Sequence, residues 1–221
     1  MNRHHILYIL GIVFAAVSLT ACSESSDEEE EFVNWQETNT AYFDQIYASA
    51  LAKANSGDAS WKVLLGYQYE STAPISTYNN VVVEVLETGT GSGCPLYTDS
   101  VRLNLRGQLL PSTSYPSGFI FLSTYNGDFN AATAATGVYG VAPNTRVTDG
   151  LSTALQRMHI GDRWRVYVPY QQGYGTTDQS STFTVPAYST LIYDVRLVAY
   201  YRAGVEVPDT YAPQATGWVE E

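Results

Sequence analysis

Residues 147–201 constrain the fold of this chain more than any other part of its sequence. Apolar side chains recur there at the helical spacing i, i+3, i+4 and i+7, at Leu151, Ala154, Leu155 and Met158. Gly161 follows where a left-handed cap commonly ends a helix, so we expect the helix to stop there. Residues 163–168 and 191–198 then alternate in the way typical of strands, and the polar loop between them carries Tyr174 between two glycines. The segment predicts a helix, a strand, a loop and a final strand.

The preceding part of the chain is rich in predicted strands. Residues 61–69, 81–86, 101–105 and 117–122 are β-branched or alternating, whereas residues 125–143 are small and polar and predict a long loop or broken segment. One short helix among several strands is typical of an α+β fold, with an antiparallel sheet and the helix against one face.

A second helix is predicted near the N-terminus. Its apolar face is formed by Trp35, Tyr42, Phe43, Ile46, Tyr47, Ala50, Leu51 and Ala54. We expect Asn34 to cap this helix with a reciprocal contact from Glu37, and residues 55–57, N-S-G, to end it. An apolar face of this kind must be buried, so the helix is expected to dock on the main domain.

The first residues have the features of a targeting signal. Arg3 precedes an apolar segment, residues 6–19, that is too short to span a bilayer stably. Residues 19–22, L-T-A-C, closely resemble a bacterial lipobox, which implies lipidation of Cys22 and a membrane anchor there. The alternative is an ordinary secretory signal with a chance cysteine. Either reading places the mature protein outside the cytoplasm, and the lipobox favours the bacterial cell envelope.

The charge of the chain is unevenly distributed. The formal net charge is −11, and six of the 22 acidic residues fall within residues 24–31. Such a run is typical of a solvated tether. It also resembles the acidic export signal of some surface-exposed bacterial lipoproteins, which favours the outer membrane and, as one option, its outer face. The acidic balance argues against binding to nucleic acid.

Few residues are available for conventional catalysis. After cleavage of the signal, His159 is the single histidine, and Cys94 is the single unmodified thiol, with no basic neighbour in the sequence. This inventory excludes an internal disulfide and metal sites made of several histidines or cysteines, and it indicates no cofactor. No serine lies in a G-x-S-x-G motif. A hydrolase with a carboxylate pair remains open, because spacing in sequence does not give spacing in space.

Three ordered motifs resemble one family. Residues 150–169, G-L-S-T-A-L-Q-R-M-H-I-G-D-R-W-R-V-Y-V-P, then G-Y-G, then residues 185–197, V-P-A-Y-S-T-L-I-Y-D-V-R-L, resemble the C-terminal half of FKBP-type peptidyl-prolyl cis-trans isomerases. The resemblance extends upstream to V-R-L-N-L-R-G at 101–107 and G-F-I-F-L-S-T at 118–124, and covers about half the chain. It implies an antiparallel sheet of five to six strands wrapped around a short central helix, with a shallow apolar pocket between them.

The resemblance also implies a site and a ligand class. The pocket residues would be Phe121, Val147, Thr148, Leu151, Tyr174, Val185 and Tyr193. The Tyr174 hydroxyl would hydrogen-bond a carbonyl of a prolyl peptide or another ligand, Phe121 would form the aromatic wall, and Thr148 would offer its backbone N–H. Tyr193 would lie at the pocket's edge, and Val185 on an apolar loop. The implied partners are proline-containing polypeptides outside the cytoplasm, with macrolide-type compounds as a further ligand class.

Three leucines depart from the family pattern. Leu151 stands where the pocket floor is normally tryptophan, Leu105 replaces an inner tyrosine, and Leu122 replaces an aspartate. The floor stays apolar, but a polar corner is lost. The main alternative is therefore a non-catalytic FKBP-fold binding module or holdase in a surface lipoprotein complex, for which the 18 tyrosines would suit peptide or glycan recognition.

These observations predict how the chain is divided. Residues 1–21 form a lipoprotein signal peptide, 22–31 an acidic tether, 32–80 the N-terminal helix with an extra strand, 81–201 the FKBP-like domain and 202–221 a C-terminal tail.

Overall fold

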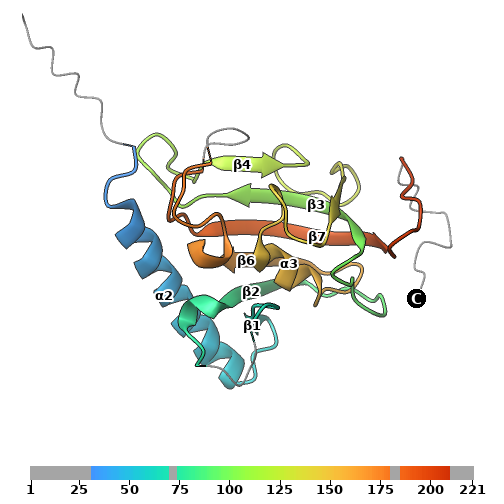
Figure 1. Cartoon of the computed structure of the whole chain (residues 1–221), viewed down its shortest axis with the longest axis horizontal. Helices are drawn as coiled ribbons and strands as arrows, with labels where there is room; N and C mark the ends of the chain where they lie inside the picture. Colours follow the sequence, from blue (N-terminus) through green and yellow to red (C-terminus); the bar gives the residue numbers. More distant parts are fainter. Residues whose placement is uncertain (1–30, 70–73, 180–184, 210–221) are drawn as a thin grey trace, which may run out of the picture. The chain divides into compact units, whose positions relative to one another are not determined.

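The computed structural model describes residues 31–69, 74–179 and 185–209 (Figure 1). The predicted signal peptide, Cys22 and all but the last residue of the acidic tether lie outside these residues, as does the tail beyond residue 209. Within the described part of the chain, no helix combines the length and the apolar composition that crossing a bilayer requires.

The described residues form one antiparallel sheet of seven strands. The strands are β1 (Trp61–Leu65), β2 (Asn80–Glu87), β3 (Ser100–Gln108), β4 (Ile120–Ser123), β5 (Gly137–Gly140), β6 (Arg163–Val168) and β7 (Leu191–Tyr201). Their order is β1-β2-β6-β7-β3-β4, and β5 also pairs with β3 (Figure 1). The predicted α+β class with a helix on an antiparallel sheet is confirmed. The sheet gains strands beyond the expected five to six because β1 extends one edge and β5 was missed.

Strand β5 corrects the prediction of a loop or broken segment at residues 125–143. It is only four residues long and has glycine at both ends, so it gives almost no alternating signal. Tertiary pairing forms it, because Tyr139 lies opposite Val101 of β3 and its ring is buried in the main core.

The central helix α3 (Asp149–Leu155) lies on one face of the sheet (Figure 1). Thr148 caps its N-terminus by accepting a hydrogen bond from the Leu151 N–H. Helix and sheet approach closely, because a Cβ at Gly150 would lie 2.4 Å from Val168 Cγ1. Larger side chains at this position would push the helix away from the sheet.

The predicted end of this helix was wrong. The helix stops at Leu155, six residues before Gly161, and the chain continues in turns to β6. Met158 is still fully buried in these turns. The apolar pattern of the sequence therefore continues beyond the last residue of the helix. Gly161 does adopt a left-handed conformation, with φ of 95°, but in the turn that starts β6, where its N–H donates to the Leu197 carbonyl.

The two faces of the sheet follow the predicted alternation. On β7, Tyr193, Val195 and Leu197 are fully buried in the core under α3, whereas Asp194 and Arg196 point to the opposite face. The same period of two on β3 and β6 places their arginines on that outer face.

The N-terminal helix α2 (Trp35–Asn55) docks on the domain, as predicted. Phe43 and Ala50 are buried against Val82 and Tyr167 on the outer face of the sheet. The helix ends at Asn55 as expected. The capping prediction was wrong: Asn34 is left-handed, with φ of 50°, and its side chain caps nothing.

Candidate functional site

Three aromatic rings meet between α3 and the sheet. Phe121 of β4 makes edge-to-face contacts with Tyr174 and with Tyr193 of β7, at ring-centroid distances of 6.3 and 5.9 Å. Such contacts contribute about 0.5–1.5 kcal/mol each beyond their buried area. Glycine at position 107 of β3 makes the arrangement possible, because a Cβ there would lie 2.6 Å from the Phe121 ring.

The helix supplies the apolar base of this site. Val147 and Leu151 are fully buried, and Thr148 is 4% exposed. The Thr148 backbone N–H makes no hydrogen bond to any part of the chain that the structure describes. As the N-cap residue, Thr148 has no acceptor in the preceding turn, which leaves this N–H available to a ligand.

Two tyrosine hydroxyls provide the other polar groups. The Tyr193 hydroxyl is buried and has no hydrogen-bond partner among the described residues. Burial raises the pKa of Tyr193 well above its ordinary value, and the neighbouring Tyr174 raises it further. The Tyr174 hydroxyl donates to the Thr145 carbonyl at 3.2 Å, and burial raises the pKa of this tyrosine too. Both hydroxyls are therefore neutral hydrogen-bond donors at physiological pH.

Val185 lies at the end of the loop that carries Tyr174. It is 1% exposed and forms an isolated bridge with Gln179. The Tyr188 N–H donates to the Gly175 carbonyl at 2.9 Å, which holds the two sides of this loop together. The structure thus brings every pocket residue implied by the resemblance into, or onto the border of, the same core. It differs from the expectation at Tyr193, which is fully buried rather than at the edge.

The three leucines make this site more apolar than the family pattern implies. Leu105 and Leu151 are fully buried, and Leu122 packs against the same core from β4. The Leu105 N–H donates a hydrogen bond to the Thr124 hydroxyl. The backbone N–H of Leu105 therefore has a hydrogen-bond partner although the side chain at this position is apolar.

Helix α2 and Glu31, which precedes it, contact the two loops that border the site. The Trp35 indole N–H donates to the Ser189 hydroxyl at 2.8 Å, and the Asn39 side chain accepts from the Thr190 N–H at 2.7 Å. Before the helix, the Glu31 carboxylate accepts hydrogen bonds from the loop that precedes Phe121, from the Ser112 hydroxyl and the Ser114 N–H. One feature of the sequence indicates that this helix makes a buried polar contact. Asn39 is a polar residue four positions after Trp35 and therefore lies on the face of the helix that was expected to be buried.

Cys94 has no basic neighbour in the sequence, but the fold places its sulfur 3.8 Å from His159 Nε2. Burial and the nearby Asp162 raise the pKa of the Cys94 thiol, so it is not an activated nucleophile. The Asp162 carboxylate accepts from the Gly89 and His159 N–H groups, each at 2.7 Å, which is a structural role in the turn before β6.

Comparison with known proteins identifies the class of this domain. Residues 97–198 match the family model described as FKBP-type peptidyl-prolyl cis-trans isomerase. This part of the chain is therefore similar to the family that its motifs resemble.

Individual proteins are similar to parts of the chain. The chain is 29% identical to the macrophage infectivity potentiator of Trypanosoma cruzi, over 57% of this chain and 56% of that protein. It is 27% identical to the FKBP-type 22 kDa peptidyl-prolyl cis-trans isomerase of Escherichia coli, over 56% of this chain and 51% of that protein. The chain thus spans about half the length of the curated relatives it matches. A crystal structure of a peptidyl-prolyl cis-trans isomerase from Pseudomonas syringae aligns with a TM-score of 0.49 and 19% identity, over 76% of this chain and 96% of that one.

Proposed function

We propose that this protein is a peptidyl-prolyl cis-trans isomerase that assists the folding of proline-containing polypeptides outside the cytoplasm. The observation that carries the proposal is the convergence of Phe121, Tyr174 and Tyr193 beside the unpaired Thr148 N–H. Rings from three separate segments and a free donor form an arrangement that can hold a prolyl ring and its neighbouring carbonyl.

The chemistry needs no nucleophile or proton shuttle. Rotation about an X–Pro bond faces a barrier of about 18–20 kcal/mol because the planar amide is stabilised by resonance. The twisted amide has lost this conjugation and is less polar, so an apolar, water-poor site favours it over the planar form. Each ~1.36 kcal/mol of such differential stabilisation gives tenfold in rate.

Each polar group then has a defined role. The Thr148 N–H would donate to a carbonyl of the bound peptide and fix the prolyl ring over Leu151. The Tyr174 hydroxyl would exchange its Thr145 acceptor for a second peptide carbonyl. One neutral hydrogen bond replaces another in this step, so the step costs little enthalpy.

A non-catalytic binding module is the second candidate, and the burial of the site favours it. Val147, Leu151 and Tyr193 are fully buried, so a prolyl ring can reach them only if the residues that cover them move. A protease-coupled assay with a prolyl tetrapeptide and residues 23–221 separates the candidates. Isomerisation faster than the uncatalysed rate at micromolar protein supports catalysis, and an unchanged rate together with peptide binding supports the module.

Tyr174→Phe is expected to lower kcat/KM by about three- to tenfold, because one hydrogen bond of roughly 0.5–1.5 kcal/mol is lost. The domain should stay folded, since the change removes only the hydroxyl and keeps the ring that contacts Phe121. Tyr97→Phe is the matched control, because Tyr97 is 44% exposed and its ring packs on Tyr67 rather than on the three rings of the site. Circular dichroism checks the fold; an unfolded Tyr174→Phe variant, or one with unchanged kcat/KM, would contradict the role of Tyr174.

We also propose the predicted division of the chain and its anchoring through lipid on Cys22, with the outer membrane as the site. The L-T-A-C motif supports the anchor, and the acidic run that follows it supports export to the surface. Several acyl chains make a durable anchor because each buried CH₂ contributes about 0.8 kcal/mol. Cys22→Ser is expected to move the protein from the membrane to the soluble fraction in cell fractionation. Retention of this variant in the membrane would exclude the lipid anchor.

A further inference from the structure

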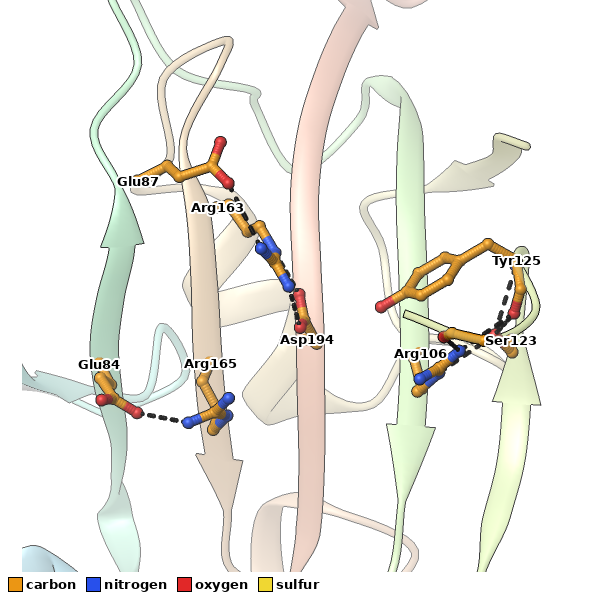
Figure 2. Close-up of polar contacts among 9 residues, drawn as sticks. Glu84, Glu87, Arg106, Ser123, Tyr125, Arg163, Arg165 and Asp194 are labelled. Atoms are coloured by element: carbon orange, nitrogen blue, oxygen red, sulfur yellow. Dashed lines mark hydrogen bonds and ion pairs between the residues drawn. The ribbon is translucent and has the colours of Figure 1, made fainter. Parts of the chain in front are cut away.

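The outer face of the sheet, opposite α3, carries several pairs of oppositely charged side chains (Figure 2). Arg165 of β6 binds Glu84 of β2 at 2.9 Å. Next to this pair, Arg163 donates two hydrogen bonds of 2.9 and 2.7 Å to Asp194 of β7 and also forms an ion pair with Glu87. Arg106 of β3 donates to the Tyr125 and Gly127 carbonyls. These arginines all have acceptors within the domain.

Arg196 of β7 differs from these arginines. Among the described residues, its guanidinium has neither a hydrogen bond nor an ion pair, and its Nε is buried without a partner. Arg163 lies directly opposite in the register, so two like charges face each other across β6 and β7. Asp194, two residues away on the same strand, directs both of its carboxylate oxygens to Arg163 and makes no hydrogen bond to Arg196 among the described residues.

A cavity of about 390 Å³ opens beside Arg196. It is lined by Arg102 and Asn104 of β3, Thr136 and a set of small alanines from residues 131–135, and Asp209 is the one acid among the described lining residues. The Asn104 amide donates to the Ala134 and Ala135 carbonyls, which fixes the alanine wall over the strands. Arg102 is 4% exposed and donates to neutral oxygens of Thr136, Tyr201 and Pro208.

We propose that this cavity binds a small oxyanion, a carboxylate or phosphate group on a compact organic body. The guanidinium of Arg196 offers a planar fork that matches such groups bidentately, and a buried donor without an acceptor is costly until one arrives. The Thr136 hydroxyl accepts from Arg102 and can donate its own proton to the anion. The alanine wall suits the apolar part of the ligand. The site is on the face of the sheet opposite the prolyl pocket and is independent of it.

The negative net charge of the protein makes specific anion binding at this cavity easy to distinguish from nonspecific attraction of anions to the protein surface. A chain with a net charge of −11 repels anions over its surface, so an anion is retained only where local donors offset this field. Dissolved salt screens the attraction between exposed charges that lie more than a Debye length apart, which is about 8 Å at physiological ionic strength. It screens a contact inside a cavity much less.

Titration of residues 23–221, which keep the acidic run and Glu31, with inorganic phosphate, phenyl phosphate and acetate, at constant ionic strength set by chloride, tests the proposal. The readouts are the NMR resonance of the Arg196 Nε–H group and the rise in melting temperature. We expect saturable shifts at millimolar ligand, with phenyl phosphate binding more tightly than inorganic phosphate because of the alanine wall. Acetate and phosphate together identify which oxyanion the cavity prefers. No saturable shift of the Arg196 resonance with any of the three would overturn the proposal.

Variants locate the binding. Arg196→Gln should weaken binding by at least about tenfold, and Arg196→Lys by severalfold, because lysine keeps the charge but loses the fork. Arg157→Gln is the matched control, since it removes the same charge from an exposed position after α3 and should bind like the wild type. Equal affinity in Arg196→Gln and the wild type would refute the site. If Arg196→Gln does not fold, Thr136→Val, which removes only the hydroxyl, should weaken binding and takes its place.

Discussion

Replacing Trp35 with alanine is expected to lower the free energy of unfolding by about 3–5 kcal/mol, the usual cost of removing a buried tryptophan. Trp35 is 8% exposed, packs edge-to-face on Phe32 at 4.9 Å and belongs to the main core although it lies on α2. Its indole N–H also holds Ser189, just before β7. Chemical denaturation followed by fluorescence measures the change.

The loss of Trp35 should also reduce prolyl isomerase activity in the molecules that remain folded. The Ser189 and Thr190 segment connects Val185 to β7, and helix α2 fixes it through Trp35 and Asn39. A freed segment would let Val185 leave the border of the prolyl site. The activity per folded molecule should therefore fall severalfold in kcat/KM.

Two further variants separate packing from hydrogen bonding at this contact. Trp35→Phe keeps a ring but loses the N–H, so it should cost about 1 kcal/mol and have a smaller effect on activity. Val33→Ala is the control, because Val33 is 54% exposed and should change neither property. Full activity in folded Trp35→Ala would mean that α2 stabilises the domain without positioning the site.

The sequence was most informative where one rule acts over many residues. Alternation on β3, β6 and β7 marked both faces of the sheet correctly because one face packs the apolar core under α3 and the other carries mostly polar side chains. It failed where tertiary contacts decide. Strand β5 exists only because β3 pairs with it, and Met158 is buried in a turn rather than a helix, so apolar spacing overestimated the length of α3.

The candidate site was predictable to a similar degree. Motifs indicated Phe121, Tyr174 and Tyr193, and the structure brings their rings into contact. The contact of Trp35 with Ser189 spans 154 residues of sequence and left no local pattern. Alternation likewise placed Arg196 on the outer face, but only the geometry shows that Arg163 takes the carboxylate that Arg196 would otherwise bind.

Replacing Leu151 with alanine is the second large perturbation. Leu151 is fully buried at the base of α3, and Leu→Ala changes at such positions cost about 2–5 kcal/mol because a cavity remains. The same change removes the floor on which a prolyl ring would rest, so kcat/KM should fall by more than the folded fraction explains. Leu155→Ala is the matched control: it is on the same helix and fully buried, but outside the proposed site.

Leu151→Trp distinguishes the two proposed functions, because it restores the residue that the family normally has at this position. The surroundings of Leu151 are already filled, so the larger ring should overpack the core and cost about 1–3 kcal/mol. If the domain is an isomerase adapted to leucine, the displaced Phe121 and Tyr174 rings should also lower kcat/KM. A folded Leu151→Trp variant with increased turnover would show instead that leucine had weakened a catalytic pocket, and it would favour binding rather than catalysis as the role of the natural chain.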